Sequence, residues 1–416
     1  MKSELKIDIS KSVSELIAAL YRIPDSEFYL VGGVVRDAVL GRKTADVDIA
    51  TNVHPSVIKE FFNANFALFE RYSIFALGEK YGTLGFADNS LERQTVEITT
   101  YRADGAYLDN RHPENVTFST SILDDLSRRD FTMNAIAVNA TDFLGIIDPF
   151  FGVEDIKKGI IRTVGEARTR FSEDGLRVLR AYRFCAQLGF ALDEKIREAA
   201  RDGGDDLIKA MKMERVKSEL EKILLANFPE KALTMAEEDT VLRGIFVGVK
   251  LKIADINEIP SIFTLRLAYL LQNAETAHAL LSTLRLTKKE QEQVAFLLKE
   301  SETDVVNFFK SEYTLAKTIN EFSVENLKLL LKFKREEGLV ARLTEFLAKN
   351  PTIFIEDLAI SGAEIMGILK VSPGPIINRV KTNLLARVWE EQSLNENEVL
   401  REILKTDKSI KKLKNV

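Results

Sequence analysis

One short stretch, residues 29–51 (YLVGGVVRDAVLGRKTADVDIAT), restricts the fold of this chain more than any other part of the sequence. Residues 28–31 form an apolar, aromatic and branched run that is typical of a strand. Gly32 and Gly33 end this run, and residues 34–40 then carry apolar side chains at helical spacing. The stretch therefore predicts a strand, a glycine turn and a short helix at the start of a mixed α/β domain.

The glycines and charged residues of this stretch suit phosphate and metal chemistry. Paired glycines let the backbone approach a ligand, and unsatisfied N–H groups at the start of a helix favour an anion. Arg36, in the first turn of that helix, adds a guanidinium that suits phosphate oxygens. Asp46 and Asp48 alternate with apolar residues and project from one face of the next strand. Although each pattern alone also fits an ordinary turn or a polar strand edge, together they predict one or two Mg²⁺ ions that bridge the carboxylates to nucleotide phosphates.

The composition indicates an ordinary soluble protein. With 416 residues, 45% of them hydrophobic, the chain is long enough for roughly two to four structural units. Its net charge of −5 gives no global basic signal, so contacts with RNA have to rely on local patches. The single Cys185 and the polar N-terminus favour a reducing cytoplasm without a signal peptide, and no apolar run predicts a membrane span. One cysteine and three histidines do not make a convincing zinc site.

The first 150 residues read as helices and strands around one sheet. The expected helices cover residues 13–21 and 55–62, and the expected strands lie near residues 73–77, 83–87 and 95–100. In the last of these strands Glu97 alternates with apolar neighbours. If this strand lies beside Asp46 and Asp48, Glu97 completes a group of three carboxylates as a metal ligand or a base. An exposed strand residue explains Glu97 equally well.

Two further segments complete this region. Residues 101–118 (YRADGAYLDNRHPENVTF) are polar, lack periodicity and predict a flexible surface loop, which beside an active site is often functional. Residues 126–139 (LSRRDFTMNAIAVN) contain a charged trio, Arg128, Arg129 and Asp130, that fits a solvated cluster. Residues 148–152 (DPFFG) predict a turn that closes the sheet domain.

From residue 160 onward the sequence predicts helices only. One is expected to begin near residue 171 with Ser172 as N-cap, which places Asp174 and Arg177 on one helical face. Such a pair can accept a hydrogen bond from the amino group of cytosine or adenine and donate one to the adjacent ring nitrogen. Uracil and guanine present the reverse order, at a cost of roughly 1–3 kcal/mol for each mismatched buried group. Arg180 and Arg183 continue the spacing of Arg177, and surface ion pairs also explain most of these arginines.

These motifs together resemble the tRNA nucleotidyltransferase and bacterial poly(A) polymerase family. In that family Gly-Gly, Arg-Asp and Asp-x-Asp recur as in residues 32–48, followed by Arg-Arg-Asp-Phe-Thr-x-Asn-Ala as in 128–135 and Glu-Asp-x-x-Arg as in 173–177. Residues 213–226, with Arg215, Glu219 and Lys222 along one side, resemble the helix that supports the base-selecting helix. The resemblance implies an α+β fold: a polymerase-β-like catalytic head with a mixed sheet (1–152), then a helical neck (153–226), body (227–330) and tRNA-binding tail (331–416).

The resemblance also implies an activity, the addition of CCA to the 3′ end of tRNA by a class II tRNA nucleotidyltransferase. CTP, CTP and ATP are joined without a nucleic-acid template, and pyrophosphate is released in a two-metal mechanism. Asp46 and Asp48 are implied to hold Mg²⁺, with Glu97 as a third catalytic carboxylate. Nucleotide contacts are implied for Gly32, Gly33, Arg36, Arg129, Asp130, Asn134, Glu173, Asp174, Arg177, Arg180 and Arg183.

Three alternatives stay open at this point. A poly(A) polymerase of the same family shares the motifs, but that branch usually carries Gly-Arg-Arg-Phe where this chain has Lys80-Tyr81-Gly82-Thr83. An A-adding enzyme that works with a separate CC-adding partner has the same motifs, and the loop at residues 101–118 resembles the one needed for adding the terminal A. A non-catalytic tRNA-binding protein is disfavoured because both aspartates are present.

The C-terminal part offers two candidate RNA contacts. A Pro-Gly-Pro turn at residues 373–375 precedes a helix expected at 376–389, and it suits a backbone phosphate as well as an ordinary helix start. Residues 405–416 hold five lysines against one aspartate and form a candidate basic contact. The sequence does not determine the oligomeric state.

Overall fold

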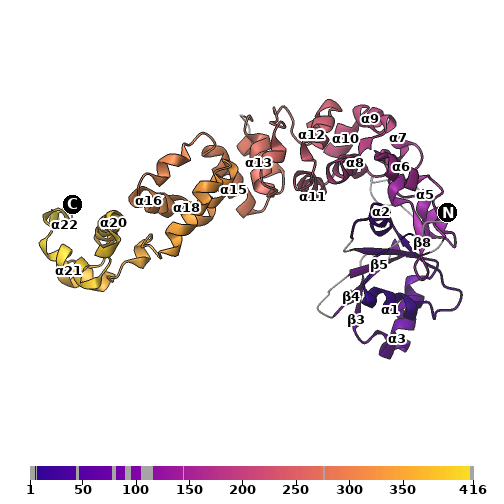
Figure 1. The fold of residues 1–416 in the computed structure, drawn as a ribbon, viewed down its shortest axis with the longest axis horizontal. Coiled ribbons are helices and arrows are strands. Elements are labelled where there is room, and N and C mark those ends of the chain that lie inside the picture. Colours follow the sequence, from indigo (N-terminus) through magenta and orange to yellow (C-terminus); the bar gives the residue numbers. More distant parts are fainter. Residues whose placement is uncertain are drawn as a thin grey trace. The chain divides into compact units, whose positions relative to one another are not determined.

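The chain forms two compact units, each with its own architecture (Figure 1). Unit 1 is Met1–Val249 and unit 2 is Lys250–Val416. The computed structural model describes residues 5, 7–43, 46–76, 81–89, 95–104, 116–143, 145–274 and 277–412. The boundary between the units falls inside the segment expected to be the body, and the finer division into head, neck, body and tail stays a prediction.

Unit 1 contains a six-stranded mixed sheet in the order β3-β4-β5-β2-β1-β8. Its strands are β1 (Phe28–Val31), β2 (Val47–Thr51), β3 (Tyr72–Ala76), β4 (Thr83–Asp88), β5 (Thr95–Thr100) and β8 (Ala137–Asn139). Strands β2 and β5 run parallel, and the other neighbouring pairs are antiparallel. The predicted mixed sheet is confirmed, and β5 lies beside β2 as the grouping of Glu97 with the aspartates requires.

Alternating burial positions the carboxylates on this sheet. Leu30 of β1 and Ile49 of β2 are register partners, and both are buried in the core. Because successive side chains of a strand point to opposite faces, Asp48 lies on the face opposite Val47 and Ile49. Asp48 is also the register partner of Glu97 in β5. A slip of one residue would turn Asp48 into the core, so the apolar alternation of β2 sets the position of the site.

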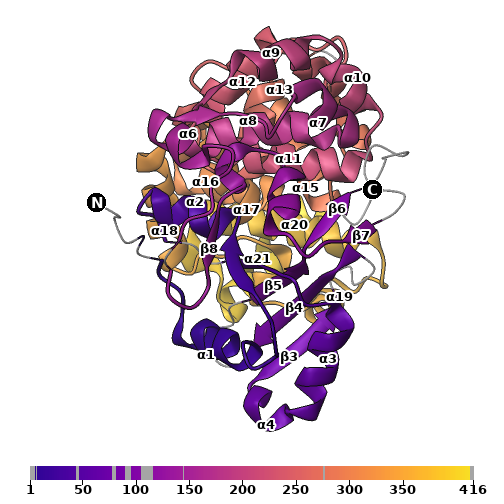
Figure 2. The same cartoon turned by 90° about the vertical axis from the view of Figure 1, so that its right-hand side faces the viewer.

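Five helices accompany the sheet, and Figure 2 shows α1 and α3 alongside the strands. They are α1 (Lys11–Leu20), α2 (Gly33–Val39), α3 (Pro55–Ala64), α4 (Phe66–Phe69) and α5 (Ile122–Ser127). Pro55 occupies the first turn of α3, as predicted, and the His54 side chain caps that helix by accepting from the Ser56 N–H. The helices expected at 13–21, 34–40 and 55–62 agree with α1, α2 and α3 to within two residues, whereas α4 and α5 were not predicted.

The expected loop at residues 101–118 has more structure at its ends than the sequence predicted. Strands β6 (Arg102–Asp104) and β7 (Val116–Phe118) pair antiparallel as a two-stranded ribbon. Their pairing is non-local, and two strands of three residues each are too short to show a clear period. Residues 105–115, to which the prediction of a flexible loop mainly referred, lie outside the described residues.

The second half of unit 1 is mostly helical. Its helices are α6 (Gly152–Lys158), α7 (Ala167–Glu173), α8 (Leu176–Leu188), α9 (Glu194–Arg201), α10 (Gly204–Lys209), α11 (Met213–Leu224) and α12 (Pro229–Glu238). The expectation of helices only is wrong in one respect, because β9 (Ile160–Ile161) and β10 (Ala191–Leu192) form a short parallel pair. Two-residue strands give no sequence pattern of their own, since a partner distant in the chain defines them.

The helix expected to begin at Ser172 is in fact two helices. Ser172 lies inside α7 and is not an N-cap; its hydroxyl donates to the Thr169 carbonyl. Asp174 follows α7 in an extended conformation (φ −145°, ψ 103°), and α8 begins after Gly175. A Cβ on Gly175 would lie 3.1 Å from the carbonyl oxygen of Leu207, so the glycine permits close packing at this break. Asp174 and Arg177 therefore do not share one helical face.

A buried charge network fixes α8 from behind. The Asp239 carboxylate, which is 0% exposed, accepts from the Tyr182 hydroxyl (2.8 Å) and from the Nε atoms of Arg197 (2.9 Å) and Arg201 (2.9 Å). Tyr182 belongs to α8, and the arginines belong to α9. Asp239 directly follows α12. Because a buried carboxylate needs its partners, this network joins α8, α9 and α12 firmly.

Unit 2 is helical throughout its described residues. Its α-helices are α13 (Phe263–Leu271), α14 (Ala277–Thr283), α15 (Lys288–Lys299), α16 (Glu312–Phe322), α17 (Val324–Phe333), α18 (Glu337–Ala348), α19 (Gly362–Leu369), α20 (Pro375–Glu390), α21 (Asn397–Thr406) and α22 (Lys408–Lys412). The predicted turn before α20 is confirmed, with Gly374 as N-cap and Pro375 in the first turn. Over the described ranges, no helix combines the length and apolar character needed to cross a membrane.

Candidate active site

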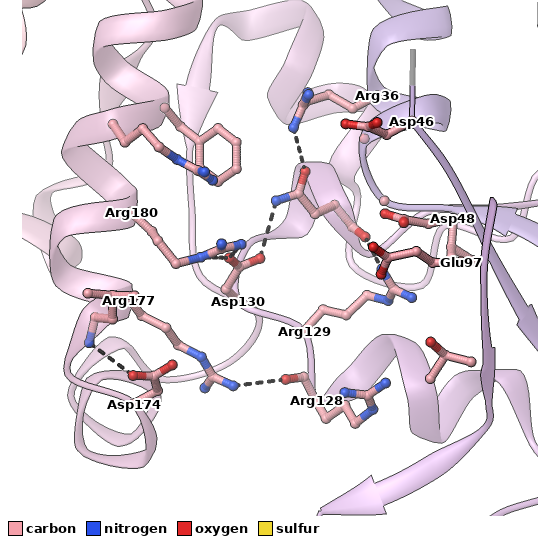
Figure 3. Close-up of a pocket in the computed structure, with 18 of the residues that line it drawn as sticks. Arg36, Asp46, Asp48, Glu97, Arg128, Arg129, Asp130, Asp174, Arg177 and Arg180 are labelled. Carbon is pink, nitrogen blue, oxygen red and sulfur yellow. Dashed lines mark hydrogen bonds and ion pairs between the residues drawn. The ribbon is translucent and has the colours of Figure 1, made fainter. Parts of the chain in front are cut away.

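A cavity of about 660 Å³ in unit 1 brings together nearly all of the predicted site residues (Figure 3). Its walls come from the β1–α2 turn, β2, β5, the segment after α5, α8 and α11. The predicted residues on its lining are Gly32, Gly33, Arg36, Asp46, Asp48, Glu97, Arg129, Asp130, Asn134, Asp174, Arg177, Arg180 and Arg183. Glu173 is not on this lining, but it contacts a residue that is. Residues far apart in the sequence therefore form one site.

The β1–α2 turn approaches the carboxylates closely. Gly32 has a positive φ of 71° and is the N-cap of α2. A Cβ at this position would lie 3.1 Å from Oδ2 of Asp48 and 3.2 Å from Nη1 of Arg129. Both the backbone conformation and the lack of space favour glycine here. Arg36 lies in the second turn of α2, not in the first as predicted from the sequence, and it still faces the cavity.

At the sheet end of the cavity, where Asp46, Asp48 and Glu97 lie, the carboxyl groups of Asp48 and Glu97 have raised pKa values. Burial raises the pKa of Asp48; Arg129 opposes this shift, and Asp46 adds to it. Burial also raises the pKa of Glu97, and the charges of Asp48 and Asp46 raise it further. Asp46 and Asp48 thus lie close enough to Glu97 to disfavour its charged form, which agrees with the predicted place of Glu97 beside the two aspartates.

The donor set at the sheet end suits a hard divalent cation, because it consists of carboxylate oxygens. In the part of the chain that the structure describes, no group of three or more His, Cys, Asp and Glu side chains is arranged as a metal site. Asp46 and Asp48 would therefore hold an ion together with other oxygens, which nucleotide phosphates and water can supply. The closeness of these carboxylates and the raised pKa values of Asp48 and Glu97 fit such an ion.

The arginines at residues 128 and 129 have a partner that the sequence analysis missed. Asp125 is completely buried and accepts from Nε of Arg128 (3.0 Å) and Nη2 of Arg129 (2.9 Å). Burial raises the pKa of Asp125, but the two guanidinium groups lower it below its ordinary value. A solvated cluster at 128–130, the alternative to the family motif, does not form, because these side chains are largely buried and Asp130 pairs elsewhere. The spacing of three and four residues from Asp125 was the available signal.

Asp130 connects the motif after α5 to helix α8. Its Oδ2 accepts from Nε of Arg180 (2.8 Å), and its Oδ1 accepts from Nδ2 of Asn134 (3.2 Å). Asn134 in turn accepts from Nη1 of Arg36 (3.0 Å), so one chain of hydrogen bonds crosses the cavity wall (Figure 3). Burial raises the pKa of Asp130, yet Arg180 and Asn134 bring it down to about 2.

Asp174 and Arg177 both face the cavity, but separate partners hold them. Asp174 accepts from Nη2 of Arg215 in α11 (3.0 Å). Arg177 pairs with Glu173 and donates to the carbonyl oxygens of Arg128 (3.3 Å) and Arg170 (3.2 Å). The predicted placement of Asp174 and Arg177 on one helical face is wrong, because the helix is interrupted at Asp174 and Gly175. The arrangement still presents an acceptor and a donor to the same cavity.

Helix α11 lies behind α8, in agreement with the supporting role that the resemblance implied. Besides Arg215, it supplies Glu219, whose Oε2 lies 3.2 Å from Nε of Arg183. Burial and the neighbouring Arg180 lower the pKa of Arg183 to about 10, so this arginine is charged at neutral pH. Arg128, Arg215 and Phe184 also line the cavity and were not among the predicted nucleotide contacts. Only the resemblance of residues 213–226 gave a signal for Arg215.

Sequence comparisons place the chain among nucleotidyltransferases. Residues 28–162 match the family described as "Poly A polymerase head domain", and residues 189–251 match "Probable RNA and SrmB- binding site of polymerase A". A CCA-adding enzyme of Leuconostoc mesenteroides is 32% identical over 394 residues, 93% of this chain and 94% of that protein. One from Lactiplantibacillus plantarum is 32% identical over 397 residues, 90% and 91% of the two chains. The chain belongs to the tRNA nucleotidyltransferase and poly(A) polymerase family, whose members use divalent metal ions.

Solved structures agree with this assignment. The CCA-adding enzyme of Bacillus stearothermophilus in complex with CTP superposes with a TM-score of 0.79 at 27% identity, covering 98% of this chain and all (100%) of that chain. A CCA-adding enzyme of Thermotoga maritima complexed with tRNA gives a TM-score of 0.64 at 21% identity, covering 95% and 96%. The second likeness concerns the fold alone.

Proposed function

We propose that this chain adds C, C and A to the 3′ end of tRNA, with CTP and ATP as substrates and release of pyrophosphate. The observation that supports this proposal is that Asp46, Asp48 and Glu97 of the sheet line the same cavity as Asp174 and Arg177, an acceptor and a donor suited to reading a base. Curated relatives that match over nearly the whole chain are CCA-adding enzymes. The partners are therefore tRNA and the two nucleotides, and we place the reaction in the cytoplasm, where a single buried cysteine stays reduced.

In this proposal the sheet end prepares the transfer. Asp46 and Asp48 hold the divalent ion, which we propose to be Mg²⁺, and Glu97 adds a third negative group beside them. When bound there, the ion would supply Lewis-acid activation of the primer 3′-hydroxyl and would neutralise charge on the phosphates. Asp48 and Glu97, at register positions on paired strands, fix where the hydroxyl meets the α-phosphate.

The phosphates of the nucleotide are bound beside these carboxylates. Gly32 and Gly33 let the backbone come close, and Arg36, Arg129 and Asn134 face the same space. The buried Asp125 holds Arg129 in place before a nucleotide arrives, so little side-chain freedom is lost on binding. Asp130 orients Arg180 in the same manner. These groups bind triphosphate whatever the base.

We assign base choice to Asp174 and Arg177, which lie at the end of the cavity lined by α8 and α11, here called the helix end. The Asp174 carboxylate accepts from the amino group of cytosine or adenine, and the Arg177 guanidinium donates to the adjacent ring nitrogen. Arg215 holds the first group and Glu173 the second, so both are oriented without a template strand. Each group left unpaired by uracil or guanine costs roughly 1–3 kcal/mol.

Primer-extension assays test this function directly. Transcripts of tRNA ending at the discriminator base or in CC are incubated with Mg²⁺ and single nucleotides. We expect C to be added to the shorter transcript and A to the one that ends in CC. Addition of A without C would replace the proposal with an A-adding enzyme, and long A tails on unrelated RNA would indicate a poly(A) polymerase. Binding of tRNA without any transfer would indicate a non-catalytic protein.

A further inference from the structure

Three arginines of the cavity converge on one aromatic ring. The guanidinium carbons of Arg36, Arg180 and Arg183 lie 5.2, 5.6 and 4.2 Å from the ring centre of Phe184. Arg36 comes from α2, whereas Phe184 and the other two arginines come from α8. The ring therefore contacts Arg36, a residue about 150 positions away in the sequence, through a cation–π interaction.

This gathering of like charges needs a physical cause. Each guanidinium repels the other two, and burial together with Arg180 lowers the pKa of Arg183 to about 10. An aromatic face is negative and attracts cations, and planar guanidinium groups stack on it well. A carboxylate anchors each arginine in addition: Asp37 for Arg36, Asp130 for Arg180 and Glu219 for Arg183.

The cluster keeps donors available to a ligand. A guanidinium has five N–H donors in a fixed plane, and a carboxylate anchor occupies only some of them. The ring of Phe184 takes up none, because a cation–π contact uses the face of the guanidinium or its charge. Phe184 itself is 4% exposed and also packs edge-on against Phe131, with ring centres 5.6 Å apart. The ring is thus held firmly while the arginines around it can still bind.

We infer that Phe184 is a positioning residue for nucleotide binding: its ring gathers Arg36, Arg180 and Arg183 into the cluster that receives the triphosphate. The inference rests on the proposed function and extends it to a residue that touches no phosphate. It implies that the ring's electrostatic potential matters, not only its volume. It also implies equal effects on CTP and ATP, since both carry the same triphosphate.

The test replaces Phe184 with mono-, di- and trifluorophenylalanine by site-specific incorporation into the full chain. Fluorination weakens the negative potential of the ring with little change in shape. The Kd of CTP and of ATP is measured by titration calorimetry without tRNA, so the result does not depend on turnover. We expect stepwise weaker binding, about tenfold for the trifluoro ring, which corresponds to ~1.4 kcal/mol. In assays with tRNA, KM should rise in parallel while kcat changes less than about threefold.

Phe171 of α7 provides the matched control. It is 1% exposed, and no cation–π contact to its ring is present among the described residues. The same fluorinated residues at Phe171 should leave both Kd values unchanged. Phe184→Leu, which removes the ring, should weaken both nucleotides at least tenfold, and the fluorinated series remains decisive if that variant does not fold.

Two outcomes separate this inference from the proposed function. A flat Kd series at Phe184, or an equal series at Phe171, would overturn the positioning role and leave CCA addition intact. Nucleotide binding that weakens stepwise at Phe184 in a protein that extends no tRNA would support the positioning role and overturn the proposed function. An effect on CTP alone would also count against the inference, because it would point to the base.

Discussion

The two ends of the cavity use aspartate in opposite ways. At the sheet end, burial raises the pKa of Asp48, and neighbouring Asp46 adds to the shift. At the helix end, Asp130 is buried too, but Arg180 and Asn134 bring its pKa down to about 2. The two aspartates differ in how their negative charge is compensated. For Asp130 the compensating cation is the Arg180 side chain. At Asp48 the opposing influence of Arg129 does not cancel the effect of burial and of Asp46.

This contrast separates a preorganised end of the site from an end that a ligand completes. Arginines 177, 180 and 183 have carboxylate partners before any nucleotide binds. At the sheet end a divalent ion and phosphates would add further compensation for the negative charge. A carboxylate whose ionised form burial disfavours, such as Asp48, lowers stability and is typical of catalytic positions. The following predictions test the contrast.

The largest effect is expected from removing an aspartate of the sheet end. Asp46→Ala and Asp48→Ala should each reduce nucleotide transfer at least about 10³-fold, roughly 4 kcal/mol of activation free energy, because the ion loses a ligand. Incorporation of radiolabelled ATP measures this, and a gel-shift assay should show unchanged tRNA binding. Asp8→Ala, at an exposed position of the same unit, is the control and should keep full activity. Activity above a tenth of the wild-type value would contradict the assignment of Asp46 and Asp48.

Removing an aspartate of the helix end should act first on stability. Asp130→Asn breaks the pair with Arg180 and leaves a buried guanidinium poorly compensated, which costs about 2–4 kcal/mol. Thermal unfolding should show a Tm lower by about 5–10 °C. Glu154→Gln, which disrupts a solvent-exposed pair with Lys158, should leave Tm within about 1 °C.

The same variant predicts a pH dependence with a definite sign. The pKa of Asp130 is lower in the folded state (about 2) than in the unfolded chain, so its stabilising contribution is complete above the unfolded value. The contribution is lost as the pH falls from about 4 toward 2. The difference in stability between wild type and Asp130→Asn, measured by denaturant unfolding at pH 7, 5, 4 and 3, should therefore shrink at the acidic end. A constant difference would argue against the ion pair.

A moderate effect on base choice is expected from Arg177→Ala. Loss of its donor should lower kcat/KM for CTP and ATP about 10- to 100-fold while UTP changes less, so discrimination falls by roughly 1–3 kcal/mol. Arg168→Ala on α7 is the matched control, since Arg168 pairs with Asp202 at the surface. If UTP and CTP lose the same factor, Arg177 binds phosphate and does not read the base.

The smallest effect is a gain in stability. Asp48→Asn removes a carboxylate whose ionised form is disfavoured by burial, so the metal-free protein should melt about 2–4 °C higher, the shift for roughly 1 kcal/mol. Its sign is opposite to that of Asp130→Asn. Added Mg²⁺ should raise the Tm of the wild type more than that of the variant. A lower Tm for Asp48→Asn in EDTA would show that the two ends do not differ in this way.

Local patterns were sufficient wherever neighbours along the chain set the geometry. The strand, glycine turn and short helix at residues 28–40 follow from spacing, and the alternation around Asp48 predicts the face on which it lies. The position of Glu97 was predicted only conditionally, because parallel pairing of β2 and β5 leaves no mark in either strand alone. The resemblance to a known family supplied the α+β arrangement and the site residues.

Partners across the fold were beyond these patterns. The sequence analysis placed Asp174 beside Arg177, whereas the break at Gly175 separates them and Asp174 pairs with Arg215. It also left Asp125 unnoticed, although this buried carboxylate holds two arginines. Such pairs depend on how the helices pack. Several different pairings of these acidic and basic side chains are compatible with the same sequence.

The sequence by itself determined the sheet end of the site: a glycine turn, a strand of fixed alternation and two aspartates on one face. These features depend on backbone conformation and a period of two residues, which neighbouring side chains encode. Only the tertiary structure decided the helix end, where Arg36 meets Arg180 and Arg183 at Phe184 and where Asp130 and Glu219 reach Arg180 and Arg183. Long-range packing selects those partners, because ion pairs and cation–π contacts form between whichever groups the fold brings together.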